Sequence, residues 1–154
     1  MRLAVAATPE VALPTLNWLL TSEHDLVRVI SQPDRPSGRG QELHASAVSE
    51  WAKANSIELT TPTAIAEIDA AISDVDLLIT IGYGVILAKQ VFELPRYGSL
   101  NLHFSLLPRW RGAAPVQRAI EAGDLVSGVT VFALDEGMDT GPIYTQHRFA
   151  LDGD

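Results

Sequence analysis

The chain has 154 residues, and 47% of them are hydrophobic, which is enough for one globular domain with a core. It has no cysteine, which excludes disulfide bonds and thiolate metal ligands, and a cytoplasmic location is the default expectation. The formal net charge of −8 excludes indiscriminate binding to nucleic acid, because neutralisation of phosphates supplies most of that affinity.

The first predicted element is an apolar run at residues 3–7, which is typical of a short buried strand. This run is too short for a secretory signal or a membrane span, so no membrane role is expected. A helical pattern covers residues 9–22, with Thr8 as the expected N-cap and Pro9 at the first helical position. A second buried strand is predicted at residues 26–31.

Residues 32–45 then form a long irregular stretch rich in proline, glycine and arginine, and a loop of this length is usually functional or disordered. Helical spacing returns at residues 46–56 and 63–73, and a third apolar strand is predicted at residues 76–81. Alternating strands and helices predict an α/β fold with a Rossmann-like, open, mostly parallel sheet and helices on both faces.

The usual chemical motifs of such folds are missing. The turn after the first strand, "AATPE", lacks the glycines of the G-x-G-x-x-G dinucleotide fingerprint, so NAD binding is not expected. Walker, nucleophile-elbow and metal-ligand spacings are absent from the sequence as well, so no metal is expected.

A polar pair in the segment "GSLNLHFSLLPRWRG" is the first candidate for chemistry. Asn101 and His103 are two residues apart in a strand-like run, so both side chains point to the same face. By itself this spacing also fits a structural pair. The turn-rich surroundings and a later carboxylate loop, "DEGMDTGP" at residues 135–142, favour a site.

An amide, an imidazole and a carboxylate suit direct group transfer, since no serine or cysteine is clearly paired with the histidine. Asn101 and His103 can hydrogen-bond an oxyanion, while an Asp of the later loop orients the imidazole or moves a proton. The loop offers three acidic residues for this role: Asp135, Glu136 and Asp139.

Five motifs carry a resemblance to a known family: "TPEVALPTL", "QPDRPSGRG", "IGYGVIL", "NLHFSLLPRWRGAAPVQRAI" and "MDTGPI". In this order and spacing, across nearly the whole chain, they resemble the methionyl-tRNA formyltransferase family. This family is one branch of a wider group of folate-dependent formyltransferases that includes glycinamide ribonucleotide and sugar-nucleotide enzymes. The resemblance implies the formyltransferase fold, a Rossmann-like sheet.

The resemblance also implies an activity and its catalytic residues. A formyl group would pass from 10-formyltetrahydrofolate to the amino group of methionine on the initiator tRNA, without a metal. The family's catalytic triad falls on Asn101, His103 and Asp139. Asn101 and a protonated His103 would stabilise the tetrahedral oxyanion, and Asp139 would hold the histidine charge and help to collect the amine proton.

The resemblance further implies which segments contact the folate and the tRNA. The folate would meet backbone groups of Tyr83, Gly84, Val85, Ile86 and Leu87 and of the loop residues Leu134, Asp135, Glu136, Gly137 and Met138. Asp135 and Glu136 are also expected to serve the loop's own hydrogen bonds.

Three arginines and one proline complete the family expectations. Arg39 matches a tRNA-entering loop, although a solvated arginine is the alternative. Arg109 and Arg111 either form a basic rim or anchor the "LPRWRG" turn by hydrogen bonds to carbonyl oxygens, and a structural role is favoured for at least one of them. The peptide between Leu107 and Pro108 is expected to be cis.

The sequence departs from the family pattern at two places and in its length. Ala7 replaces a glycine after the first strand, and "QELHASA" replaces the lysines and prolines that commonly follow "GRG", which weakens the expected grip on tRNA. Residues 1–154 are expected to be an N-terminal catalytic domain, incomplete at its C-terminus, without the C-terminal tRNA-binding domain. The alternatives are a glycinamide ribonucleotide or other folate-dependent formyltransferase, and a non-catalytic folate-binding fragment. A monomer is expected.

Overall fold

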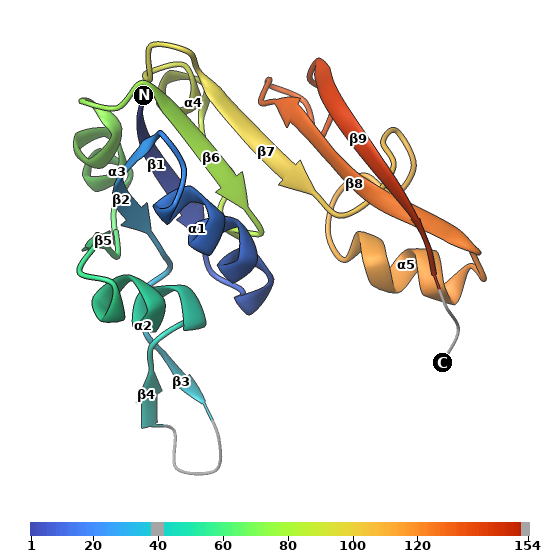
Figure 1. Ribbon diagram of the computed structural model, residues 1–154, viewed down its shortest axis with the longest axis horizontal. Coiled ribbons are helices and arrows are strands. Elements are labelled where there is room, and N and C mark those ends of the chain that lie inside the picture. The colour runs from blue at the N-terminus through green and yellow to red at the C-terminus, as the bar shows by residue number, and fades with distance from the viewer. Residues whose placement is uncertain (38–41, 152–154) are drawn as a thin grey trace. The chain divides into compact units, whose positions relative to one another are not determined.

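A parallel sheet forms the centre of residues 1–99 in the computed structural model, which describes residues 1–37 and 42–151 (Figure 1). The strands are β1 (Arg2–Ala7), β2 (Asp25–Ile30), β5 (Glu58–Thr60) and β6 (Leu77–Ile81). β1 pairs in parallel with β2 and with β6, and β2 pairs in parallel with β5. The order β5-β2-β1-β6 reverses direction at β1, as in doubly wound sheets.

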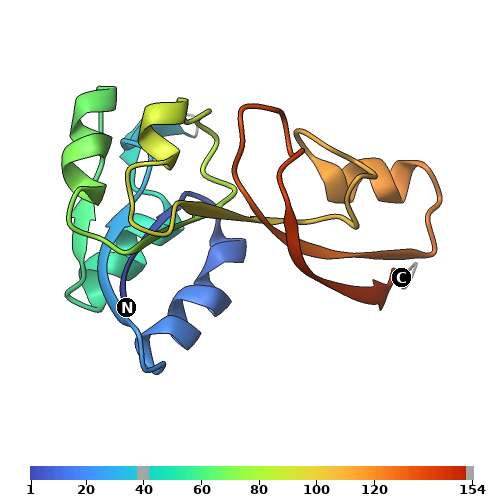
Figure 2. The ribbon, with the colours of Figure 1, turned by 90° about the horizontal axis from the view of Figure 1, so that it is seen from above.

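Helices cover both faces of this sheet (Figure 2). A short 3-10 helix, η1 (Glu10–Ala12), and α1 (Leu13–Leu20) pack with α2 (Ala47–Ala54). On the other face, α3 (Ile65–Ile72) and α4 (Lys89–Phe92) contribute to one apolar cluster with strand residues. The three predicted helices and three predicted strands are thus confirmed, and the mostly parallel α/β class with them.

Alternation along β1 explains why its sequence is apolar throughout. Ala4 and Ala6 belong to the cluster under α3 and α4, whereas Leu3, Val5 and Ala7 are buried on the opposite face. A parallel strand covered by helices on both faces has no solvent side, so it has no polar positions to alternate with.

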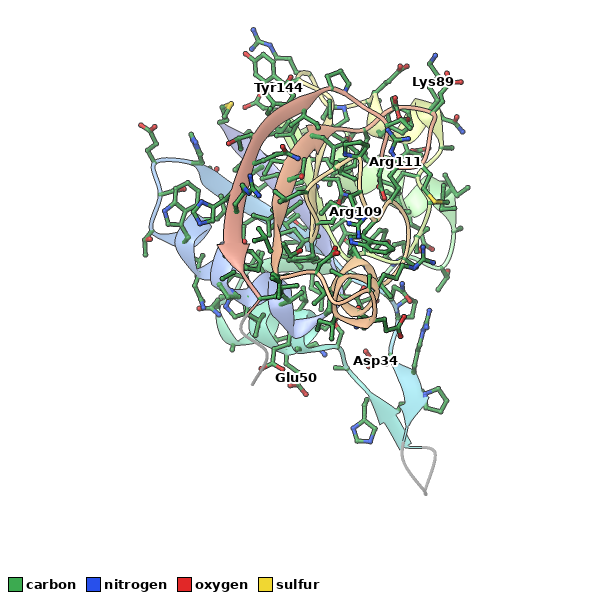
Figure 3. The ribbon with its side chains drawn as sticks, turned by 90° about the vertical axis from the view of Figure 1, so that its right-hand side faces the viewer. Asp34, Glu50, Lys89, Arg109, Arg111 and Tyr144 are labelled. Carbon is green, nitrogen blue, oxygen red and sulfur yellow. The ribbon has the colours of Figure 1, made fainter. Side chains whose placement is uncertain are left out.

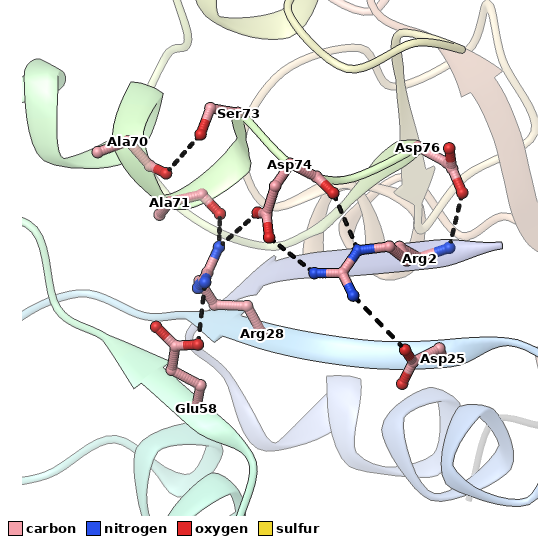
Figure 4. Close-up of polar contacts among 9 residues, drawn as sticks. All are labelled: Arg2, Asp25, Arg28, Glu58, Ala70, Ala71, Ser73, Asp74 and Asp76. Carbon is pink, nitrogen blue, oxygen red and sulfur yellow. Dashed lines mark hydrogen bonds and ion pairs between the residues drawn. The ribbon is translucent and has the colours of Figure 1, made fainter.

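Charged side chains connect the strand beginnings at the amino-terminal edge of the sheet (Figure 4). Arg2 donates to Asp74 (2.7 Å) and approaches Asp25 at 3.9 Å. Arg28, whose side chain is 13% exposed, donates to Asp74 (3.1 Å), to Glu58 (2.9 Å) and to a helix carbonyl oxygen. We call these five residues the edge network.

Two local predictions are wrong. Thr8 does not cap the first helix: Pro9 precedes η1, α1 has Ala12 at its N-cap, and the Thr8 hydroxyl donates instead to the carbonyl oxygen of Tyr83 (3.1 Å). Residues 32–45 are not irregular throughout, because β3 (Arg35–Ser37) pairs antiparallel with β4 (Glu42–His44). A tertiary hydrogen bond from Thr8 to Tyr83 decided the first case and cross-strand pairing the second, and neither is visible in periodicity.

The second unit, residues 100–154, is built on antiparallel pairing. β7 (Ser99–His103) pairs with β8 (Val126–Ala133), and β8 pairs with β9 (Ile143–Ala150). α5 (Pro115–Glu121) lies in the connection between β7 and β8. Within the described ranges of the chain, no helix has the length and apolar character needed to cross a lipid bilayer.

Candidate active site

His103 is the centre of the candidate site in the second unit. It is the last residue of β7, lies opposite Thr130 of β8, and is only 6% exposed. Its ring meets the ring of Phe132 edge to face, with the centroids 6.5 Å apart. A histidine held this tightly by a strand and an aromatic ring has its orientation fixed before any ligand arrives.

The two ring nitrogens of His103 face different groups. Nε2 donates to the backbone carbonyl oxygen of Trp110, at 2.9 Å. Nδ1 lies 3.6 Å from Oδ2 of Asp139, close enough for an ion pair when the ring is protonated. Because a carbonyl oxygen can only accept, Nε2 carries the hydrogen of this bond, and Nδ1 is the nitrogen that faces Asp139.

Asp139 is aimed at the imidazole by two backbone features. Its own φ is +53°, a left-handed conformation that a non-glycine residue adopts at a cost. Its Oδ2 accepts a hydrogen bond from the amide N–H of Gly112 at 2.7 Å. The predicted pairing of His103 and Asp139 is therefore present, and the "PRWRG" turn supplies an amide to it that the sequence did not reveal.

The rest of the acidic loop holds itself together. Oδ1 of Asp135 accepts from the amide of Gly137 (3.0 Å) and from the hydroxyl of Thr140 (2.8 Å). Asp135 thus makes the internal hydrogen bonds that were expected of it. Leu134 is half-buried, and Glu136 and Met138 are exposed.

Asn101 occupies the same strand as His103, two residues earlier, opposite Phe132 in the β7–β8 ladder. It is half-buried. The i, i+2 spacing within a regular strand places both side chains on one face, as predicted. Asn101, His103 and Asp139 all belong to the second unit.

Trp110 is held by a clamp of two charged side chains. Oδ2 of Asp124 accepts from Nε1 of Trp110 (2.7 Å) and from Nε of Arg109 (2.9 Å), and its Oδ1 accepts from Nη2 of Arg109 (2.7 Å). The Arg109 guanidinium lies 4.4 Å from the centre of the Trp110 ring. The bond from Arg109, and then that from Trp110, lowers the pKa of Asp124 to about 2.

The predictions for the three arginines have different outcomes. Arg109 is a structural residue, although it anchors the turn through the carboxylate of Asp124 rather than through carbonyl oxygens. Arg111 is exposed (Figure 3). The peptide between Leu107 and Pro108 is cis, as expected. Arg39 lies outside the described residues.

The turn at residues 81–87 belongs to the first unit and follows β6. The side chain of Tyr83 is buried in the apolar cluster, and burial raises its pKa. Its carbonyl oxygen accepts from Nε2 of Gln32 at 2.6 Å as well as from Thr8. Tyr83 therefore builds the turn, and its carbonyl group is already occupied.

Residues 84–87 of the same turn are open. Gly84 adopts φ +78°, and Val85 and Ile86 are exposed, Ile86 to 90%. The amide groups of residues 84–87 have no hydrogen-bond partner within the described part of the chain. Free amides and an exposed apolar side chain at the carboxyl end of a parallel strand suit a flat heterocyclic ligand.

Three groups of the site were not predicted from the sequence: the carbonyl of Trp110, the amide of Gly112 and the carboxylate of Asp124. The first two are backbone groups, which any residue type carries, so no pattern announces them. Asp124 follows a helix in a turn, where an aspartate is common for local reasons.

The profile of a family described as formyl transferase matches residues 1–153. The chain belongs to the formyl transferase family. Among curated relatives, this formyl transferase chain is 48% identical over 151 residues to a methionyl-tRNA formyltransferase of Hydrogenovibrio crunogenus, covering 94% of the chain and 48% of the relative. It spans about half the length of the curated relatives it matches.

Solved structures share the fold of this formyl transferase chain at low identity. A phosphoribosylglycinamide formyltransferase from Anaplasma phagocytophilum matches with a TM-score of 0.82 at 23% identity, covering 100% of this chain and 74% of that one. A sugar 3N-formyl transferase, solved in the presence of dTDP and 5-N-formyl-THF, matches with a TM-score of 0.69 at 24% identity, covering 99% and 53%. These likenesses establish the Rossmann-like fold.

Proposed function

We propose that this formyl transferase chain carries the catalytic groups that move a formyl group from 10-formyltetrahydrofolate to the amino group of methionyl initiator tRNA. The observation that supports this most directly is the buried His103 beside the carboxylate of Asp139, with Asn101 on the same strand face. The substrate assignment is supported by relatives named methionyl-tRNA formyltransferase at 46–50% identity.

The transfer needs no covalent enzyme intermediate. The neutral amine attacks the formyl carbon, and the formyl oxygen becomes an oxyanion that accepts hydrogen bonds from the Asn101 amide and from protonated Nδ1 of His103. Asp139 stabilises the imidazolium and helps, directly or through water, to remove the proton of the attacking amine. The bond from the formyl carbon to the folate nitrogen then breaks, that nitrogen gains a proton, and tetrahydrofolate leaves.

Each unit offers backbone groups that are proposed to contact the folate. In the first unit, the free amides of residues 84–87 suit the hydrogen-bonding edge of a pteridine. In the second, backbone groups of residues 134–138 in the acidic loop remain predicted contacts. The sugar 3N-formyl transferase solved with 5-N-formyl-THF supports a folate as the donor.

The partner assignments go further than the described residues. Arg39 is proposed as a contact to the acceptor end of the tRNA, and Arg39→Ala should then weaken tRNA use with an effect that shrinks as salt rises. A monomer in the cytoplasm remains the expectation. The solved neighbour named phosphoribosylglycinamide formyltransferase shares only the fold with this chain, at 23% identity, so it does not support glycinamide ribonucleotide as the acceptor.

The test compares acceptors in the full-length protein. With 10-formyltetrahydrofolate as donor, we expect formylation of methionyl initiator tRNA and none of glycinamide ribonucleotide. Calorimetry with a non-hydrolysable formylfolate analogue checks donor binding on its own. Formylation of glycinamide ribonucleotide instead of tRNA would overturn the acceptor assignment, and no heat at millimolar analogue would overturn the donor assignment.

A further inference from the structure

Trp110 has an unfavourable backbone conformation that serves a purpose. Its φ is +59°, which places a large non-glycine residue in the left-handed region at a cost of about 1–2 kcal/mol. In this conformation its carbonyl oxygen receives the hydrogen bond from Nε2 of His103. Strained residues of this kind persist only where the surrounding structure holds them in place.

The clamp of Asp124 and Arg109 is what holds the Trp110 side chain. Asp124 accepts three hydrogen bonds, one from Trp110 and two from Arg109, and the guanidinium also covers the indole face. Asp124 is itself anchored, since its backbone N–H donates to the carbonyl oxygen of Ala119 in α5 at 2.9 Å. The clamp therefore ties the indole to the end of a helix.

We propose that Asp124 is a positioning residue for His103, acting through Trp110. The inference rests on the proposed function, since it explains how the imidazole is prepared for formyl transfer. The Asp124 carboxylate fixes the indole, the fixed indole keeps the Trp110 carbonyl directed at Nε2, and that carbonyl keeps the hydrogen on Nε2. Nδ1 is thereby reserved for Asp139 and the reacting atoms.

Loss of the clamp has a defined consequence. Without the bond to Nε1, Trp110 can relax to a negative φ, and its carbonyl oxygen turns away from the imidazole. The imidazole then loses the contact that fixes its orientation and its Nε2 hydrogen, so Nδ1 is no longer held toward Asp139 and the reacting atoms. The rate of transfer falls, while folate binding is unaffected.

The deciding measurement is the tautomer of His103, read from its two ring ¹⁵N chemical shifts in the full-length protein at a pH where the ring is neutral. The signals are assigned by their absence in His103→Gln. In the wild type we expect the hydrogen on Nε2. In Asp124→Ala, and in Trp110→Phe, which removes the Nε1 donor but keeps an aromatic ring, we expect the two nitrogen shifts to move toward each other.

Asp74→Ala is the matched control, because it also removes a carboxylate that joins charged side chains, but in the edge network. It should leave the His103 shifts unchanged. In steady-state assays Asp124→Ala should lower kcat about 10-fold, because the His103 imidazole stays in the site but is less well oriented. The KM for the folate should be unchanged.

The failures are distinguishable. Wild-type shifts in both Asp124→Ala and Trp110→Phe would overturn the role of Asp124, and if Asp124→Ala does not fold, Trp110→Phe decides alone. Absence of formyl transfer in the wild-type protein would instead overturn the proposed function.

Discussion

Two aspartates of this formyl transferase chain are held by arginines in similar ways, yet their neighbours differ. Asp74 in the first unit accepts from Arg2 and Arg28, and these bonds, that of Arg2 first, lower its pKa. Asp124 in the second unit accepts from Arg109 and Trp110, with the same direction of pKa shift. Charge pairing alone therefore does not distinguish the two.

The two aspartates differ in the groups that their hydrogen-bond partners contact in turn. Among the residues that the structure describes, the edge network leads from Asp74 to other strand beginnings and a helix carbonyl oxygen, at the end of the sheet opposite the turn at residues 81–87. From Asp124, the contacts lead through Trp110 to a buried imidazole. An ion pair that fixes strand positions stabilises a fold, whereas one that fixes a carbonyl beside a titrating group can also set chemistry.

The largest expected effect separates the site from the edge network by rate. His103→Ala removes the oxyanion donor, and we expect transfer to slow by about 10²–10³-fold, or about 3–4 kcal/mol of transition-state stabilisation. Folate binding and the folded state should be retained. Single-turnover formylation by the full-length protein measures this, with Asp74→Ala as the control that keeps the wild-type rate. A wild-type rate for His103→Ala would reject the mechanism.

A substitution in the loop that carries Asp139 should act next most strongly. A Cβ placed on Gly141 would lie far inside contact distance of the carbonyl oxygen of Ala133, so the loop backbone must move. We expect Gly141→Ala to cost about 1–3 kcal/mol of stability and to slow transfer as well.

Gly98→Ala is the comparison for Gly141→Ala in urea unfolding. Gly98 has φ +72°, and its Cβ would meet nothing closer than 3.9 Å, so only the strain of about 1 kcal/mol applies. Equal losses for the two variants would show that crowding at Gly141 is unimportant.

In the edge network, Arg28→Ala should lower stability without changing the rate of transfer. Its partly buried guanidinium bonds Glu58, Asp74 and a helix carbonyl, and we expect a loss of about 1–2 kcal/mol, since both carboxylates are half exposed or more. Glu93→Ala removes an exposed ion pair of 3.9 Å in α4 and should cost less than about 0.5 kcal/mol. A slower transfer by Arg28→Ala would contradict the division between the regions.

The sequence was a good guide where one residue type has one physical use. Apolar runs and helical spacing located three parallel strands and three helices, though not α4, because burial between two layers leaves no alternative pattern. The Asn101 and His103 pair could be found because a two-residue spacing in a strand fixes the face. Asp139 could be matched only because "MDTGPI" resembles a motif of the family, since the residues alone left Asp135, Glu136 and Asp139 open.

Features that depend on backbone conformation or on tertiary pairing could not be predicted from the sequence. Trp110 and Asp139 have left-handed φ angles, which are uncommon at non-glycine residues and could not be located from residue type alone. The strands β8 and β9 and the pairing of β3 with β4 depend on cross-strand contacts, and Asp124 gains its role from partners that the fold brings to it.

The smallest expected effect is a loss of folding stability at low pH. It tests whether Asp124 and Asp74 stabilise the fold in the same way although only Asp124 acts on His103. The folded-state pKa of Asp124 is about 2, below the unfolded value of 3.8, so its bonds stabilise the fold fully above about pH 4. That contribution is lost as the pH falls through about 2. The difference in Tm between wild type and Asp124→Asn should thus be constant from pH 7 to pH 5 and shrink between pH 4 and pH 2.

Asp74→Asn should lose its Tm difference from the wild type in the same direction as the pH falls, because the pKa of Asp74 is also lowered. Added salt should reduce both differences, since Arg109 is 58% exposed and Asp74 is 50% exposed. Only Asp124→Asn should also move the His103 nitrogen shifts; a shift in Asp74→Asn would join the two regions, and a Tm difference for Asp124→Asn that does not narrow by pH 2 would contradict the low pKa.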